Sequence, residues 1–206
     1  MTAQATAATT HGLATGREHG PFITKLNTTW HRRGMWLFLA FVLAHWGEHI
    51  VQAIQIWVLH WKRPDALGIV GLWFPELVRG EYLHYFYAVG MLIGFIILLP
   101  GMVGRARTWW KVALAIQVWH HFEHLLLFGQ ALLHENLLGK PVPTSIVQLM
   151  FERVELHLFY NAIVFIPMLI AMYYHLVPPR NEVRATCSCA IENRLRAKQP
   201  EPALAD

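Results

Sequence analysis

Four long apolar runs constrain this chain more than any other feature of its sequence. They cover residues from about 34–61, 82–104, 108–136 and 146–177. A helix needs about 20 residues to cross the hydrocarbon layer of a bilayer, and each run is long enough. With 55% apolar and 15% charged residues, the chain is also more apolar than an ordinary soluble domain. The sequence therefore predicts an all-α integral membrane protein built as one four-helix bundle.

The segments outside these runs are polar. Residues 1–29 are rich in Thr, Ala and Gly and contain no apolar stretch typical of a cleavable signal peptide. We therefore expect a flexible N-terminal tail (1–29), a membrane domain (30–177) and a flexible C-terminal tail (178–206). Several tryptophans near the ends of the runs suit a membrane–water interface. They are Trp30, Trp36, Trp57, Trp61, Trp109 and Trp110.

Basic residues are distributed unequally among the connecting segments. They gather before the first run, between the second and third, and after the fourth, whereas the other two connections hold few. Because cytoplasmic loops carry an excess of Lys and Arg, both termini are expected in the cytoplasm of a multi-pass cell-membrane protein. The net charge of +4 thus reflects topology and not nucleic-acid binding. The outward connection from Ala66 to Val78 is too apolar for a plain loop, and we expect it to lie on the interface or fold back onto the bundle.

The first two runs resemble the last two in sequence. A shift of 75 positions aligns His45, Glu48, His49 and Gln55 with His120, Glu123, His124 and Gln130. A shift of 73 aligns His84 and Tyr87 with His157 and Tyr160. Helical periodicity could mimic matching leucines, but not H-x-x-E-H followed by Gln at one offset, twice. The sequence therefore predicts two duplicated helical hairpins in parallel orientation.

Each H-x-x-E-H motif points two imidazoles and a carboxylate in one direction, because residues at i, i+3 and i+4 share a helix face. At about 1.5 Å per residue, histidines of all four runs lie near one level. A carboxylate in the membrane costs about 2.5–3.5 kcal/mol on insertion scales, so Glu48 and Glu123 require a proton, a partner or a cation. We therefore expect a bound transition metal. The candidate ligands are His45, Glu48, His49, His84, His120, Glu123, His124, Glu155 and His157.

A ligand set of histidine and carboxylate suits iron, zinc or manganese, and two equivalent halves indicate two ions. The leading hypothesis is an intramembrane oxidoreductase with a dinuclear non-heme iron site. Its substrate would be lipophilic, such as a lipid chain or a quinone, and a redox partner would supply electrons. Glu48, Glu123 and Tyr160 are the candidate catalytic residues.

Two other functions remain open at this point. H-x-x-E-H is also the signature of inverzincin metallopeptidases, in which two histidines bind zinc and the glutamate is the base, so a membrane zinc hydrolase is one alternative. A heme b electron carrier is another, with axial pairs such as His84 and His157 or His49 and His124. A metal transporter is less favoured because the histidines lie in one layer, and a purely structural polar network would need no metal at all.

The remaining metal-binding residue types lie near the ends of the runs or beyond them. Cys187 and Cys189 could bind a soft metal, but no partner ligand lies near them in sequence, so we interpret them as reduced thiols in the C-terminal tail. His60, His134 and His175 are expected at the interface.

Overall fold

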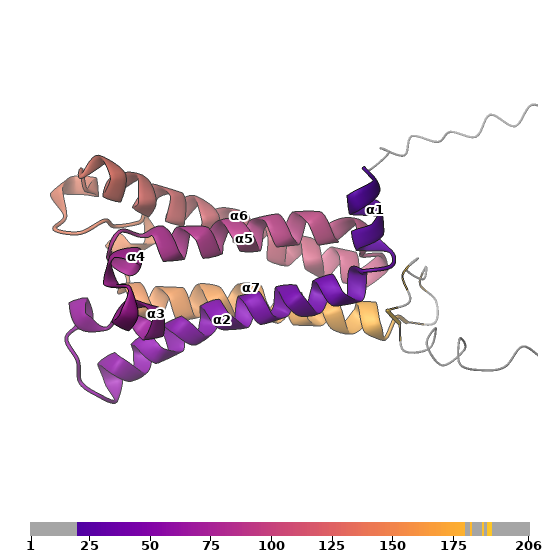
Figure 1. Cartoon of the computed structure of the whole chain (residues 1–206), viewed down its shortest axis with the longest axis horizontal. Helices are drawn as coiled ribbons and strands as arrows, with labels where there is room; N and C mark the ends of the chain where they lie inside the picture. Colours follow the sequence, from indigo (N-terminus) through magenta and orange to yellow (C-terminus); the bar gives the residue numbers. More distant parts are fainter. Residues whose placement is uncertain (1–19, 180–181, 183–186, 188, 191–206) are drawn as a thin grey trace, which may run out of the picture.

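The computed structural model describes residues 20–179, 182, 187, 189 and 190, and these residues form helices and turns but no strand. Four long helices lie side by side along the long axis of the molecule (Figure 1). They are α2 (His31–Trp57), α5 (Tyr82–Leu98), α6 (Gly104–Leu133) and α7 (Arg153–Leu176). Both α2 and α6 contact α5 and α7. The four helices therefore surround a common interior.

Short elements lie at the two ends of the long helices. Helix α1 (Pro21–Asn27) lies at one end, here called the α1 end, together with the start of α2 and the end of α7 (Figure 1). Helices α3 (Gly68–Trp73) and α4 (Pro75–Arg79) lie at the opposite end, here called the α3 end. Four short 3-10 turns complete the connections. They are η1 (Arg63–Asp65), η2 (Leu99–Gly101), η3 (Leu137–Gly139) and η4 (Val147–Leu149).

Helix α1 is fastened to the long helices by one buried side chain. Asn27 Nδ2 donates to the carbonyl of Ile97 at 2.8 Å, and its Oδ1 accepts from the amide of Gly101 at 2.8 Å. The flexible tail predicted for residues 1–29 is therefore too long, because residues 21–27 form a packed helix. Residues 1–19 of that tail lie outside the described residues.

The outer faces of the long helices expose apolar side chains where a water-soluble protein would expose mainly polar ones. On α6, Gln117 and Glu123 are buried, whereas Val118 and Phe122 are exposed on the outer face. Large exposed apolar side chains such as Leu37 also cover the outer face of α2. Monomeric soluble proteins rarely expose contiguous apolar surface on this scale.

Three of the described helices are long and apolar enough to cross a membrane. They are α2, α5 continued through η2 (Tyr82–Gly101) and α7. The prediction of four spans is thus supported for the first, second and fourth runs. Helix α6 has 30 residues but is not among the three, and its first turns carry Arg105, Arg107 and Lys111.

Several helix boundaries differ from the prediction; α5, for example, ends at Leu98 and not near residue 104. Two further differences lie at the α3 end. The first run continues to about residue 61, but α2 ends at Trp57. The fourth run starts near 146, but α7 begins at Arg153. In both places, the residues that were expected to be helical belong to connections, and buried side chains of α2 and α6 hold these connections in place.

An apolar core fills the interior between the α1 end and the middle of the long helices. Phe38, Phe95 and Trp110 are in ring contact there. The indole Nε1 of Trp110 donates to the carbonyl of Phe95 at 2.8 Å, and the side chain is fully buried. Trp110 is therefore a core residue and not the interfacial residue that was predicted. The other five predicted interfacial tryptophans are all exposed.

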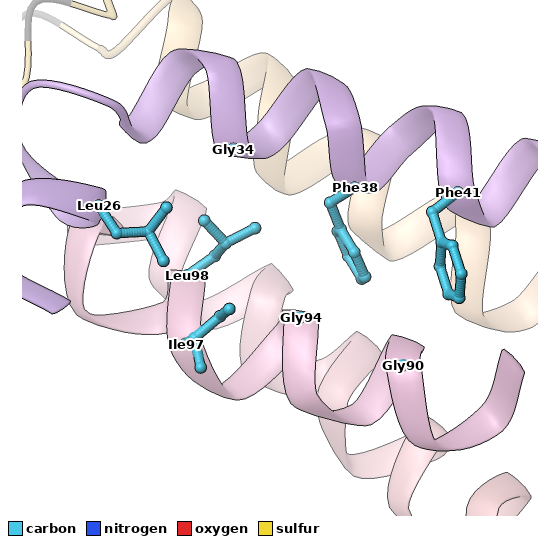
Figure 2. A pocket seen from close by; sticks show the side chains of 8 residues that line it. All are labelled: Leu26, Gly34, Phe38, Phe41, Gly90, Gly94, Ile97 and Leu98. Atoms are coloured by element: carbon cyan, nitrogen blue, oxygen red, sulfur yellow. The ribbon is translucent and has the colours of Figure 1, made fainter. Parts of the chain in front are cut away.

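Helices α2 and α5 meet through glycines. An apolar pocket of about 250 Å³ lies between them, and Phe38 and Phe41 of α2 point towards Gly94 and Gly90 of α5 (Figure 2). A Cβ at Gly94 would lie 2.4 Å from the Phe38 ring, and one at Gly90 would lie 2.7 Å from the Phe41 ring. Small residues at these positions let the two helices approach with aromatic rings between them.

Candidate metal centres

Six buried histidines meet in the interior, from all four long helices. They are His45 and His49 of α2, His84 of α5, His120 and His124 of α6 and His157 of α7. The centroids of contacting rings lie between 4.5 Å (His120 and His124) and 6.4 Å (His45 and His84) apart. The structure therefore brings together every histidine that the sequence analysis selected as a ligand. We call this group the six-histidine cluster.

Two of these rings have hydrogen bonds that orient them for metal binding. His49 Nδ1 lies 2.8 Å from Gln52 Oε1, and His157 Nδ1 lies 2.7 Å from the carbonyl of Arg153. Because both partners are acceptors, Nδ1 carries the proton in each ring and Nε2 keeps its lone pair. Histidines that bind metals typically donate their other ring nitrogen in this way.

Many ring nitrogens of the cluster are buried and have no hydrogen-bond partner among the described residues. They are both nitrogens of His45 and His84, Nε2 of His49, and Nδ1 of His120 and His124. Each buried polar atom without a partner costs about 1–3 kcal/mol. His120 Nε2 and His124 Nε2 lie 3.2 Å apart, and two nitrogens at about 2.0–2.1 Å from one ion would be separated by about 3.0–3.4 Å. This one pair of nitrogens therefore has the separation expected of two ligands of a single ion.

The two glutamates of the motifs do not take part in this cluster. Glu48 accepts hydrogen bonds from the amides of Ile69 at 2.7 Å and Val70 at 3.1 Å, at the start of α3. Glu123 accepts from the amide of Val147 at 3.0 Å and the hydroxyl of Ser145 at 3.1 Å. These contacts do not support the expectation that both carboxylates are metal ligands, because their oxygens hold the outer connections in place.

A different carboxylate lies beside the cluster. Among the described residues, a cluster nitrogen comes within 4.0 Å of a carboxylate at one place, where His84 Nδ1 lies 3.9 Å from Glu81 Oε2. Glu81 is buried and forms an ion pair with Arg153. Glu81 lies three residues before His84 in sequence, but it precedes α5 and has a positive φ of 63°, so its position beside His84 and its pairing with Arg153 both depend on the fold.

Glu155 is also not a ligand in this structure. Its carboxylate forms two hydrogen bonds with the guanidinium of Arg63, at 2.7 and 3.0 Å, at the surface of the α3 end. The bond to Glu155 raises the pKa of Arg63. Glu155 was selected because it lies near His157 in sequence, yet an exposed arginine from the first outer connection reaches it.

Tyr160 lies between a surface pocket and the cluster. Its ring centroid is 4.6 Å from that of His120, and its hydroxyl accepts a hydrogen bond from Trp119 Nε1 at 2.7 Å. It also lines an apolar pocket of about 290 Å³ together with Val147, Phe151 and Phe159. A molecule in this pocket would contact the tyrosine that packs on a cluster histidine.

The aligned residues of the two hairpins make equivalent contacts. Gln55 forms hydrogen bonds with both the amide and the carbonyl of Gly68, and Gln130 does the same with Thr144. His45 packs on Tyr87 with centroids 4.8 Å apart, which matches the contact between His120 and Tyr160. The apolar connection after α2 therefore folds back onto the helices, as predicted.

A second group of metal-binding side chains lies at the α1 end. His31, His175, Cys187 and Cys189 are all buried, their ligand atoms all lie within 4.8 Å of one another, and the group could hold a metal ion. Hydrogen bonding, first from Cys189 and then from His175 and His31, holds the pKa of the Cys187 thiol far below its usual range, against burial that raises it. The interpretation of the cysteines as thiols without partner ligands is therefore wrong, and His175 is not interfacial.

Sequence reasoning missed this second group because His31 is distant from the cysteines in sequence and polar residues separate His175 from them.

No protein-family model matches the chain, and no curated protein or solved structure matches it. What the chain does must therefore be inferred from its own geometry.

Proposed function

We propose that the chain is a membrane-embedded, metal-dependent oxidoreductase whose six-histidine cluster holds two transition-metal ions, with iron as the first choice. The observation that carries this proposal is the set of buried ring nitrogens without partners on His45, His49, His84, His120 and His124. Imidazole suits iron, copper, nickel and zinc. A bound ion would give a partner to each of these nitrogens that faces it with a lone pair, such as Nε2 of His49.

Two ions are inferred because the shifts of 75 and 73 positions align the six histidines as two triplets. One triplet is His45, His49 and His84, and the other is His120, His124 and His157. The ring centroids of His49 and His84 are 5.2 Å apart, and those of His124 and His157 are 5.0 Å apart. Three protein ligands leave a position open on each ion, which is the arrangement of catalytic and not structural metal sites.

The contacts of the cluster argue against both alternatives. A zinc hydrolase of the H-x-x-E-H type needs a glutamate as general base, but Glu48 and Glu123 are bound to loop amides. A heme needs a macrocycle between its two axial histidines. His49 and His157 each belong to one of the candidate axial pairs, and their rings stack directly on each other with centroids 4.7 Å apart, so a macrocycle between the rings of either pair would have to separate them. Non-heme redox chemistry is therefore the function that the geometry supports best.

The membrane setting that we propose comprises four spans, with both termini in the cytoplasm. The apolar outer face of α6, with Val118 and Phe122 exposed, supports a fourth span even though the helix contains many polar residues. Basic residues at the α1 end, such as Arg32, Arg105 and Arg107, support a cytoplasmic location for that end. The equivalent contacts of Gln55 and Gln130 support a duplicated hairpin.

The pocket at Tyr160 supports a lipophilic substrate, such as a lipid chain or a quinone. Its lining of Val147, Phe151, Leu156 and Phe159 is almost entirely apolar. Tyr160 is retained as a candidate catalytic residue because it lies between this pocket and His120. Iron would supply the electron transfer, whereas the chain would bind the substrate and exclude water.

Elemental analysis of the chain, purified in detergent without an affinity tag, tests which metal is bound and how many ions each chain holds. The Cys187→Ser/Cys189→Ser background is used so that the group at the α1 end contributes no thiolate-bound ion. We expect about two metal ions per chain, mainly iron, and a loss of at least one ion on His45→Ala or His124→Ala. His134→Asn is the matched control because His134 is exposed and has a positive φ of 55°, which Asn tolerates. Less than one ion per chain in the background, or equal metal content in all variants, would contradict the proposal.

Oxygen consumption tests the reaction. The iron-loaded chain in lipid nanodiscs is mixed with a lipid-soluble quinol under air, and we expect consumption that is lost in His124→Ala and retained in His134→Asn. A chain that holds zinc and has no oxygen or quinol dependence would exclude redox chemistry.

A further inference from the structure

The group at the α1 end has the geometry of a closed four-ligand site. His31 Nδ1 lies 3.1 Å from His175 Nε2, and Cys187 Sγ lies 3.2 Å from the same His175 nitrogen. Cys189 Sγ lies 3.8 Å from His31 Nδ1. A tetrahedral zinc ion, with about 2.0–2.1 Å to nitrogen and 2.3 Å to sulfur, would separate its ligand atoms by about 3.3–3.8 Å. The observed separations between ligand atoms lie close to those expected for a tetrahedral zinc site.

One of the two imidazoles is oriented by a backbone partner. His31 Nε2 lies 3.3 Å from the carbonyl of Leu98, so it carries the proton and leaves the lone pair of Nδ1 facing the other three residues. The ring is seated against Gly101, where a Cβ would lie 2.5 Å from His31 Nε2. The position of this ligand is thus set by the turn after α5.

We propose that His31, His175, Cys187 and Cys189 bind one structural zinc ion that fastens the C-terminal segment to the start of α2 and the end of α7. Two thiolates and two imidazoles in tetrahedral arrangement select zinc among the common divalent ions. The protein fills all four positions, and a closed zinc site is structural. A cytoplasmic α1 end would keep both thiols reduced, as zinc binding requires.

This site is separate from the six-histidine cluster. His31 precedes His45 by 14 residues of α2, which is about 21 Å along the helix, and His175 follows His157 by 18 residues of α7, which is about 27 Å. The two sites also differ in chemistry, because the six-histidine cluster has no sulfur ligand among the described residues. The zinc site therefore does not depend on the proposed oxidoreductase function, and each can fail without the other.

Zinc content tests the proposal in the full chain, purified in detergent without an affinity tag. We expect one zinc ion per chain in the wild type and in His124→Ala, and its loss in Cys187→Ser/Cys189→Ser. Circular dichroism checks that the helices of the double variant remain folded. A zinc content in the folded double variant equal to that of the wild type would overturn the proposal, because zinc in the six-histidine cluster would add equally to both.

Two measurements on the wild-type chain keep the test decisive if the double variant does not fold. Replacement of zinc by Co²⁺ should give a thiolate-to-cobalt absorption band in the near ultraviolet, and the chain has only two cysteines that could produce it. Both thiols should react with a thiol reagent faster after a chelator is added than before. Absence of the cobalt band, together with equal thiol reactivity with and without chelator, would overturn the proposal.

Discussion

Arg153 of α7 forms a partly buried ion pair with Glu81, the residue that precedes α5. This pair connects two histidines of the cluster, because Glu81 lies 3.9 Å from His84 and the carbonyl of Arg153 accepts a hydrogen bond from His157 at 2.7 Å. The side chain of Glu81 is 2% exposed and that of Arg153 is 34% exposed. The two partners therefore differ in how easily each could reach water if the other were removed.

The first prediction is that Arg153→Met destabilises the chain more than Glu81→Gln. Arg153→Met leaves a buried carboxylate without its partner, and loss of one partner from a buried pair costs about 3–5 kcal/mol. Glu81→Gln leaves an arginine that is already one-third exposed and can extend into water. Thermal unfolding in detergent measures both variants, and a smaller loss in Arg153→Met than in Glu81→Gln would refute this reading of the pair.

The second prediction concerns Glu48, whose carboxylate holds the start of α3. Glu48→Ala removes hydrogen bonds to a charged acceptor that are worth about 1.5–3 kcal/mol each, so the connection from Gly68 to Val70 should exchange its amide hydrogens faster. The metal content of the six-histidine cluster should stay unchanged because Glu48 is not a ligand. Glu123→Ala should act in the same way on the connection near Val147. Loss of metal in either variant without faster exchange would restore the glutamates as ligands.

The third prediction concerns the glycines between α2 and α5. Gly94→Ala places a Cβ 2.4 Å from the Phe38 ring. Displacing this ring, which packs on Phe95 and Trp110, costs about 1–3 kcal/mol. Gly129→Ala is the matched control, because no atom lies within 4 Å of its Cβ and alanine stabilises a helix by about 1 kcal/mol relative to glycine. We therefore expect opposite shifts in the thermal unfolding temperature. Equal shifts of the same sign would show that the Phe38 contact does not limit the helix approach.

The fourth prediction concerns Asn27, which joins α1 to the turn after α5. Asn27→Leu leaves the amide of Gly101 and the carbonyl of Ile97 without this partner, at a cost of about 1–3 kcal/mol for each buried group. We expect protease cleavage near α1 to accelerate while the six-histidine cluster keeps its metal. Thr24→Ala is a control on the same helix, because the Thr24 hydroxyl bond to Gly20 is exposed.

The fifth prediction concerns Gln52, which accepts the hydrogen bond from His49 Nδ1 at 2.8 Å. Gln52→Leu should lower the metal affinity of the six-histidine cluster by about 10–100-fold, because partners of ligating histidines contribute to that extent. Gln117→Leu makes the same change at a buried glutamine that bonds to the carbonyl of Ala88, and it should leave the affinity near the wild-type value. Titration with a competing chelator measures both. Equal affinities would mean that His49 is not a ligand.

Three features could be predicted from the amino-acid sequence alone: the long helices, the three spans that length and composition support, and the meeting of the six histidines. These follow from local rules, because apolar runs give spans, and the 3.6-residue period decides which side chains share a face. His45, His49, His120 and His124 could be placed in the interior because each lies on the same helix face as its motif partner. The equivalent contacts of Gln55 and Gln130 likewise follow the offset of 75 residues that the sequence displays.

The hydrogen-bond partners of these side chains, in contrast, could be identified only from the folded structure. Glu48 and Glu123 bind backbone amides more than 20 residues away, and helical periodicity says nothing about where a connection folds back. His31 and Cys189 are 158 positions apart, so their approach depends on the packing of α2 against α7. Hydrogen bonds and metal sites join atoms that are close in space but can be far apart in sequence. For that reason the partners of Glu48 and Glu123, and the group at the α1 end, could be found only in the folded chain.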